Sequence, residues 1–275
     1  MNNNTKITVL ILTYNEEVNI TYALKNVMDW AHEVVILDSY STDNTVEIAK
    51  QYGAKVFFKK FEDFSSQRKH AFKELPFEGS WIFVLDADEY LTEELKKETK
   101  SKIENTKNDA FIINRRFYWK DKWIKRGYYP TKLLRFGRKG KIDCDDRPIN
   151  EHIICKSGNV GYLKNDFIDH NRKDIYDWLA KHNDYSNREA KQLFDKEYKK
   201  YNFFGSQYER KSAIRVNVWN KLPPIIRPFL YFFYRYIFKL GFLDGKEAFQ
   251  YHFLHAFIFR MIIDFKYLEM KWRKN

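Results

Sequence analysis

Three acidic residues follow a short apolar run in the first third of the chain. Residues 81–85 read Trp-Ile-Phe-Val-Leu, and Asp86, Ala87, Asp88 and Glu89 come directly after them. A short apolar run without alternation predicts a strand that is buried on both faces of a parallel sheet. In an extended segment the side chains of Asp86 and Asp88 would share one face. This DXD motif suits a hard divalent cation, which usually also takes oxygens from a substrate diphosphate. The alternative is an ordinary solvated acidic turn.

Two more polar clusters follow apolar runs nearer the N-terminus. They are Thr13, Asn15 and Glu16 after a predicted strand at residues 7–12, and Asp38 and Ser39 after one at residues 33–37. Because parallel strands end at one edge of a sheet, we expect these clusters to converge with the acids. The first two could then hydrogen-bond a base and a ribose. The first loop has no glycine, which argues against a nicotinamide-type phosphate loop.

The elements that must position these clusters alternate along the chain. We expect another strand at 54–58 and helices at 17–30, 42–52, 64–75 and from Thr92 onward. Strand–helix alternation predicts a doubly wound, mostly parallel α/β sheet with right-handed crossovers.

Composition limits the kinds of partner. The chain has 275 residues, 18% aromatic residues and a formal net charge of +12, which implies an anionic partner: nucleic acid, a membrane surface or a phosphorylated substrate. Two cysteines without metal-type spacing, Cys144 and Cys155, predict reduced thiols in a cytosolic setting. We expect neither a secretory signal segment nor a membrane-spanning helix, since no window offers about 20 uncharged apolar residues.

The last quarter of the chain is basic and amphipathic. Residues 201–275 hold 13 lysines and arginines against five acids. On a helix at residues 227–240, Arg227, Arg235 and Lys239 fall within one arc of about 120°. The opposite side carries Ile226, Phe229, Leu230, Phe233, Ile237 and Leu240. This pattern is typical of a helix in a membrane interface, and the basic excess favours an anionic leaflet. The alternative is packing on the rest of the chain or on a second subunit.

Residues 115–141 interleave aromatic and cationic side chains. They could stack RNA bases, bind a sugar acceptor or form a solvated hairpin; we favour the acceptor, and single out Arg135 for contact with a diphosphate. His170 follows a strand-like piece at residues 162–168 and could complete the metal site or the diphosphate site, or serve a structural role.

Several motifs together resemble family 2 glycosyltransferases of GT-A fold. They are residues 10–17 (Leu-Ile-Leu-Thr-Tyr-Asn-Glu-Glu), 35–39 with 41–43, Gln67-Arg68 and residues 85–89. Further motifs at residues 134–136, 149–151 and 241–245 are most similar to the branch with the lipopolysaccharide core β-1,4-glucosyltransferases.

The resemblance implies a role for each matching residue. Glu16 and Asp38 would hold the base and ribose, Arg68 would lie near the diphosphate, Asp86 would contact the ribose and Asp88 would bind the metal. Glu151 matches the catalytic base, although the usual Val-His-Glu pattern is here Ile149-Asn150-Glu151 with His152 after it. The full predicted set for the nucleotide sugar is Thr13, Asn15, Glu16, Asp38, Ser39, Arg68, Asp86, Ala87 and Arg135, with Asp88 and His170 as metal ligands.

These motifs imply an inverting, Mn²⁺- or Mg²⁺-dependent hexosyltransferase. It would move glucose from UDP-glucose onto a lipid-attached saccharide, such as a lipopolysaccharide or lipooligosaccharide inner core, as a peripheral protein on the cytoplasmic face of the inner membrane. We expect a GT-A catalytic domain at 1–205, with a nucleotide-sugar half at 1–110 and an acceptor half at 111–205, and a basic amphipathic helical region at 206–275. The alternatives are transfer of N-acetylhexosamine or galactose in capsule or lipid-linked glycan synthesis, a nucleic-acid-binding protein, and a non-catalytic membrane scaffold.

Overall fold

The computed structural model describes residues 5–145, 152–195, 204 and 207–274. The chain divides into two compact units: residues 1–121 with 129–172, and residues 122–128 with 173–275. The expected domain boundary at residue 205 lies outside the described residues.

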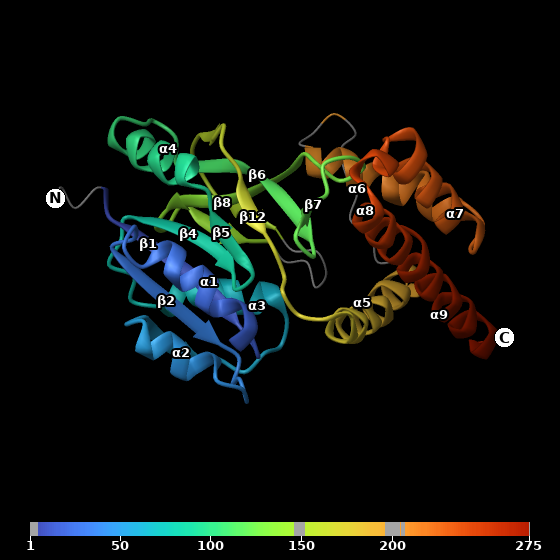
Figure 1. Cartoon of the computed structure of the whole chain (residues 1–275), viewed down its shortest axis with the longest axis horizontal. Helices are drawn as coiled ribbons and strands as arrows, with labels where there is room; N and C mark the ends of the chain where they lie inside the picture. Colours follow the sequence, from blue (N-terminus) through green and yellow to red (C-terminus); the bar gives the residue numbers. More distant parts are fainter. Residues whose placement is uncertain (1–4, 146–151, 196–203, 205–206, 275) are drawn as a thin grey trace. The chain divides into compact units, whose positions relative to one another are not determined.

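A mixed sheet forms the centre of the first unit (Figure 1). Its strand order is β3-β2-β1-β4-β8-β6-β12-β5, with β11 paired to β6. The first four strands in this order are mutually parallel, whereas β8 runs antiparallel to β4 and β6. The strands are β1 (Ile7–Thr13), β2 (Glu33–Asp38), β3 (Lys55–Phe58), β4 (Trp81–Asp86), β5 (Glu89–Leu91), β6 (Ala110–Trp119), β8 (Thr131–Arg138), β11 (Val160–Tyr162) and β12 (Phe167–Asp169). A separate antiparallel pair is formed by β9 (Ile142–Cys144) and β10 (Ile153–Cys155).

Helices cover both faces of the parallel strands. They are α1 (Glu17–Val27), α2 (Thr45–Gln51), α3 (Phe64–Glu74) and α4 (Glu93–Glu104). Alternate residues of β1 point to opposite faces: Val9 and Ile11 pack in one core with α1, and Leu10 packs in the other with α3. Burial on both faces explains the non-alternating apolar runs. The predicted α/β fold class with a C-terminal helical region is confirmed.

The second unit is helical. It contains β7 (Lys122–Trp123), α5 (Ile175–Asp195), α6 (Gln207–Asn217), α7 (Ile226–Phe233), α8 (Lys246–Tyr251) and α9 (Phe259–Lys274). A π-helical turn, Tyr234–Phe238, continues α7, and another, His252–Ile258, joins α8 to α9. Helix α5 packs along α9 through Ala190, Phe259 and Ile263. Among the described residues, none of the helices has the length and apolarity that crossing a bilayer requires.

The arginines of the predicted cationic face do not face solvent. Arg227 is 4% exposed and Arg235 is 2% exposed. The guanidinium of Arg227 binds Asp264 on α9, which the local helical pattern around residue 227 could not indicate. Only Lys239 of the three cations is exposed. The amphipathic pattern is therefore present, but its two arginines point into the unit.

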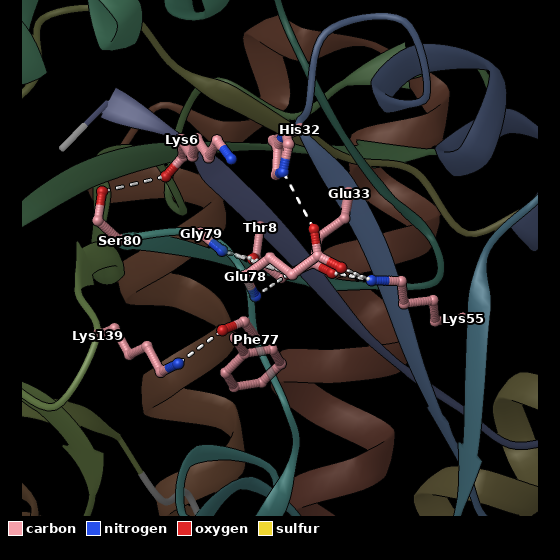
Figure 2. Close-up of polar contacts among 10 residues, drawn as sticks. All are labelled: Lys6, Thr8, His32, Glu33, Lys55, Phe77, Glu78, Gly79, Ser80 and Lys139. Carbon is pink, nitrogen blue, oxygen red and sulfur yellow. Dashed lines mark hydrogen bonds and ion pairs between the residues drawn. The ribbon is translucent and has the colours of Figure 1, made fainter. Parts of the chain in front are cut away.

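A polar clamp joins the amino ends of β1, β2 and β3 to the loop before β4 (Figure 2). The buried carboxylate of Glu33 accepts hydrogen bonds from Thr8, from Lys55 at 2.7 Å and from the backbone N–H of Glu78 at 2.6 Å. The N–H of Gly79 donates to Thr8 at 3.0 Å, and a Cβ at Gly79 would lie 2.5 Å from the backbone nitrogen of Thr8. This close approach requires glycine at residue 79 and fixes the start of β4.

Replacing Glu33 with glutamine should destabilise the first unit at neutral pH. Burial raises the pKa of Glu33, but the hydrogen bonds from Lys55, Thr8 and Glu78 outweigh it, so the net pKa is lowered from 4.5. A lowered carboxyl pKa adds stability that is present above the unfolded pKa and is lost as the pH falls through the folded pKa. We expect Glu33→Gln to cost about 2 kcal/mol at pH 7 and progressively less below pH of about 4.5.

Thermal unfolding of the full chain across this pH range measures the effect. Glu47→Gln on the exposed side of α2 is the matched control and should change little. A loss of stability in Glu33→Gln that stayed constant down to acid pH would contradict the electrostatic role of the clamp.

Candidate active site

The polar clusters predicted from the sequence follow strands that are direct neighbours in the sheet. Thr13 at the end of β1 pairs with Asp38 at the end of β2, and Leu12 pairs with Asp86 at the end of β4. The carboxyl ends of three parallel strands thus lie side by side. In open α/β sheets this edge is where ligands bind.

Asp38 organises the loop that follows β2. Its carboxylate is fully buried and accepts hydrogen bonds from the hydroxyl of Thr13 at 2.7 Å, the N–H of Ser41 at 2.7 Å and the hydroxyl of Ser41 at 2.6 Å. Both oxygens of the carboxylate are therefore engaged within the chain. The predicted contact of Asp38 with a base or ribose stays a prediction.

The loops after β1 and β2 are tied to each other. Asn15 has a φ of 53°, a left-handed conformation that asparagine tolerates. Its N–H donates to Ser41 at 2.8 Å, and the N–H of Glu16 donates to Thr45 at 2.7 Å. The carboxylate of Glu16 accepts from Asn19 at 2.8 Å. These ties place Asn15 and Glu16 beside the segment that begins α2.

Ser39 connects this region to α3. Its N–H donates to the carbonyl of Thr13 at 2.9 Å, and its hydroxyl accepts from Gln67 at 2.6 Å. Gln67 is buried and precedes Arg68 on the same helix. The helix thereby brings the Arg68 guanidinium to the end of β4.

Two arginines and two acids form one ionic network at the end of β4. Asp86 lies 3.2 Å from Nη2 of Arg68 through Oδ1 and 2.8 Å from Nη2 of Arg135 through Oδ2. The same Nη2 of Arg135 donates to Glu89 at 2.8 Å. Each arginine is only 6% exposed, whereas the side chain of Asp86 is 37% exposed. The network therefore opens to solvent on the side of Asp86.

Burial acts against charge throughout this network. It raises the pKa of Glu89 to about 8, with Arg135 acting in the opposite direction. Burial also works to lower the pKa of Arg135, but Asp86 and Glu89 together raise it. Arg135 is therefore a fixed cation whose Nε finds no hydrogen-bond partner among the described residues. This geometry suits an anionic ligand such as a diphosphate.

The predicted extended geometry of the acidic triplet is wrong. Strand β4 ends at Asp86, Ala87 and Asp88 form a turn, and Glu89 begins β5. The turn is tight because the carboxylate of Glu89 accepts the N–H of Asp86 at 2.9 Å. Ala87 is 3% exposed and packs in the core below the site. The turn separates Asp86, which binds the arginines, from Asp88.

Asp88 and His170 are brought together by the backbone. The N–H of His170 donates to the carbonyl of Asp88 at 2.9 Å. Burial, aided by Arg172, lowers the pKa of His170, which favours the neutral imidazole that a metal requires. Asp121 contacts the ring Nε2 at 3.4 Å, and the Tyr118 ring lies 5.4 Å from it.

This pair fits a cation only in part. Among the described residues, no group of three or more histidine, cysteine or acidic side chains could hold a metal by itself. One carboxylate and one imidazole match a Mg²⁺ or Mn²⁺ ion that takes its remaining ligands from water and substrate phosphate. Asp88 and His170 are thus the residues that would hold it.

The predicted base, Glu151, lies outside the described residues, and its role stays a prediction. Its neighbour His152 is described, and its N–H donates to Asp145 at 3.1 Å.

Two arginines of the predicted acceptor segment are paired within the first unit. Arg115 contacts Asp169 at 2.8 Å, and Arg116 contacts Asp166 at 2.8 Å. Tyr129 also donates to Asp166, at 3.2 Å. These contacts fix β6 against β12 and leave less positive charge for an extended nucleic-acid groove than the sequence suggests.

Sequence reasoning assigned no role to Glu89, Tyr118 or Asp121. Glu89 carried a usable signal, because an acid at the first position of a buried strand needs a partner. Tyr118 and Asp121 reach His170 only through the pairing of β6 with β12, about 50 residues further along the chain, and no local pattern marks them.

The comparison with known families decides the class. The model of glycosyl transferase family 2 matches residues 8–170, which include every described site residue named above. The chain belongs to glycosyl transferase family 2. The expected enzyme class, a glycosyltransferase, is thereby confirmed, whereas the lipopolysaccharide core branch stays a prediction.

This family 2 glycosyltransferase is similar to proteins from several bacteria. An uncharacterized glycosyltransferase of Rickettsia typhi is 29% identical over 213 residues, covering 72% of this chain and 71% of that protein. The SPbeta prophage-derived glycosyltransferase SunS of Bacillus subtilis is 38% identical over 100 residues, covering 35% of this chain and 22% of that one. A crystal structure of S. aureus TarS, residues 1–349, aligns with a TM-score of 0.46 and 16% identity over 98% of this chain and 91% of that chain.

Replacing Asp38 with asparagine tests whether this buried acid organises the site. An amide donor would face the hydroxyls of Thr13 and Ser41, so we expect a loss of about 1–3 kcal/mol in the free energy of unfolding. Calorimetry of unfolding measures this effect, with exposed Asp29→Asn as control. Unchanged stability would show that Asp38 does not organise the loops.

Proposed function

We propose that the protein is an inverting hexosyltransferase that uses a nucleoside diphosphate sugar, UDP-glucose first, with Mn²⁺ or Mg²⁺. One observation carries this proposal: Asp86, which pairs with two buried arginines, and Asp88, whose carbonyl accepts the N–H of His170, lie two residues apart at the end of β4. Two arginines close to the residues that would hold a divalent cation match a sugar donor whose leaving group is a diphosphate.

The residues of the chain divide the chemistry among them. As the sugar departs, negative charge grows on the diphosphate, and Arg68 and Arg135 are held where they can stabilise it. The cation would supply further stabilisation as a Lewis acid. Asp86, as the most exposed member of its network, would meet the ribose. Asn15, Glu16 and Ser39, on the neighbouring loops, would bind the rest of the nucleotide.

The acceptor hydroxyl must lose a proton as it attacks. A carboxylate or imidazole within hydrogen-bond reach performs this step, and Glu151 or His152 would supply it. A single displacement inverts the anomeric centre and needs one base. Retaining glycoside hydrolysis, in contrast, uses a nucleophilic carboxylate and an acid/base carboxylate.

The proposed acceptor is a saccharide attached to lipid, such as the inner core of lipopolysaccharide or lipooligosaccharide, reached from the cytoplasmic face of the inner membrane. The motifs at residues 134–136, 149–151 and 241–245 support this choice by their resemblance to the core glucosyltransferases. The basic composition of residues 201–275 supports contact of the C-terminal helices with an anionic membrane surface.

A release assay with UDP-sugars tests the transferase. The full chain with UDP-glucose and Mn²⁺ should release UDP, and Asp88→Ala should reduce kcat/KM by about 100-fold. Asp29→Ala, which removes an exposed acid, is the control and should retain activity. Release from UDP-N-acetylglucosamine or UDP-galactose alone would assign the alternative donor. Absence of release from every nucleotide sugar would reject the proposal.

Paired substitutions identify the base. Glu151→Gln should lower kcat by about 100-fold or more while leaving the KM for the donor nearly unchanged, because a base acts on the acceptor proton. His152→Gln should then have a small effect. A large loss in His152→Gln with an active Glu151→Gln would transfer the role to the histidine.

A further inference from the structure

The outward side of α7 and the residues that follow it is almost entirely apolar. Phe238 is 77% exposed, Ile226 is 54% exposed and Phe233 is 52% exposed. The surface, called the apolar face below, consists of Ile225, Ile226, Phe229, Leu230, Phe233, Tyr234, Ile237, Phe238, Leu240, Phe242 and Leu243. A soluble monomer rarely leaves so many large apolar side chains in one short segment unless they bind something.

Buried arginines hold the helix in this orientation. Arg227 donates to Asp264 at 2.7 Å through Nε. Arg235 donates through Nε to the carbonyl of Gly127 at 2.9 Å, and its guanidinium lies 5.0–5.5 Å from the ring centres of Tyr128, Tyr231 and Tyr251. Turning the helix to bury its phenylalanines would break these contacts. The exposure of the apolar face is therefore built into the unit.

The exposed charges within the segment that carries the apolar face are all positive. Between residues 218 and 246 the exposed charged side chains are Lys221, Lys239 and Lys246. The single acid of that stretch, Asp244, is 5% exposed and binds Arg126 at 2.7 Å. A surface of apolar residues bordered by lysines complements anionic headgroups above hydrocarbon.

The chemistry of the apolar face favours lipid over a protein partner. Protein interfaces form about one hydrogen bond per 100–200 Å². The exposed side chains from Ile225 to Leu243 offer only the hydroxyl of Tyr234 and the ammonium of Lys239 for such bonds. Lipid chains require none. The helical part, residues 226–238, is shorter than the roughly 20 residues that crossing a bilayer needs, so the face would lie in the interface.

We propose that the apolar face inserts into the interface of an anionic bilayer, with the lysines at the headgroups and the arginines inside the protein. This inference deepens the proposed function, which puts the acceptor in a membrane, by naming the surface that docks there. It reverses the arrangement expected from the sequence, in which the arginines would face the headgroups.

Flotation of the full chain with vesicles, without nucleotide sugar or acceptor, tests the inference independently of catalysis. The protein should bind vesicles of equal parts phosphatidylcholine and phosphatidylglycerol, and bind phosphatidylcholine alone more weakly. The triple variant Phe233→Ser, Phe238→Ser and Leu243→Ser should lose about tenfold or more of this binding. Its thermal unfolding midpoint should stay close to that of the wild type, since each side chain is at least half exposed.

A matched control distinguishes an effect of the apolar face from a general effect of removing exposed apolar side chains. The triple variant Tyr176→Ser, Ile214→Ser and Phe265→Ser removes side chains of similar exposure from other helices of the same unit and should bind vesicles as the wild type does. Replacing Lys221, Lys239 and Lys246 with glutamate should abolish the preference for anionic lipid.

Two results would overturn the inference. Equal vesicle binding by wild type and the first triple variant would remove the apolar face as the docking surface. Failure of the wild type to bind vesicles, with self-association that the first triple variant abolishes, would make it an interface between copies of the chain. UDP release in solution is measured in parallel, so failure of docking and failure of the transferase proposal are told apart.

Discussion

The carboxylate of Asp86 forms ion pairs with two buried arginines at once, and the rest of the site depends on this. Arg68 comes from α3 and Arg135 from β8, and each would be an uncompensated charge in a low-dielectric region without an acid beside it. The buried carboxylate of Glu89 accepts hydrogen bonds from Arg135 and from the N–H of Asp86. The same network therefore shapes the turn that carries Asp88. The cationic groups and the turn with the cation ligand are thus fixed by one set of contacts before any ligand arrives.

The residues that stabilise the sheet and those that form the candidate site lie at opposite ends of its parallel strands. At the amino edge, the carboxylate of Glu33 joins three parallel strands to the loop before β4 through hydrogen bonds within the first unit. At the carboxyl edge, hydrogen bonds hold the loops in place, yet the side chain of Asp86 remains more than a third exposed and Nε of Arg135 has no hydrogen-bond partner within the described part of the chain. A binding site requires this combination of a rigid scaffold and polar groups at one edge of the sheet that can still contact a ligand.

The four parallel strands β1 to β4, their alternation with helices and the convergence of the polar residues at their ends could be predicted from sequence, because buried parallel strands read as continuous apolar runs and end in polar residues. The local geometry of the acidic residues was harder to predict. The spacing of Asp86 and Asp88 suggests one extended segment, whereas the hydrogen bond from the N–H of Asp86 to the carboxylate of Glu89 closes a turn between them. The orientation of α7 could not be predicted at all. Its helical pattern places Arg227 and Arg235 on one side, but the partners that turn them inward, Asp264 and the Gly127 carbonyl, lie far along the chain.

A crystal structure of the chain with UDP and Mn²⁺ would test the central claim most directly, with anomalous scattering to locate the metal. The account predicts that Asp88 and His170 would hold the manganese ion and that the diphosphate of UDP would bind near Arg68 and Arg135. Nucleotide and metal bound at another part of the chain, with the Asp86 network undisturbed and distant from both, would contradict it.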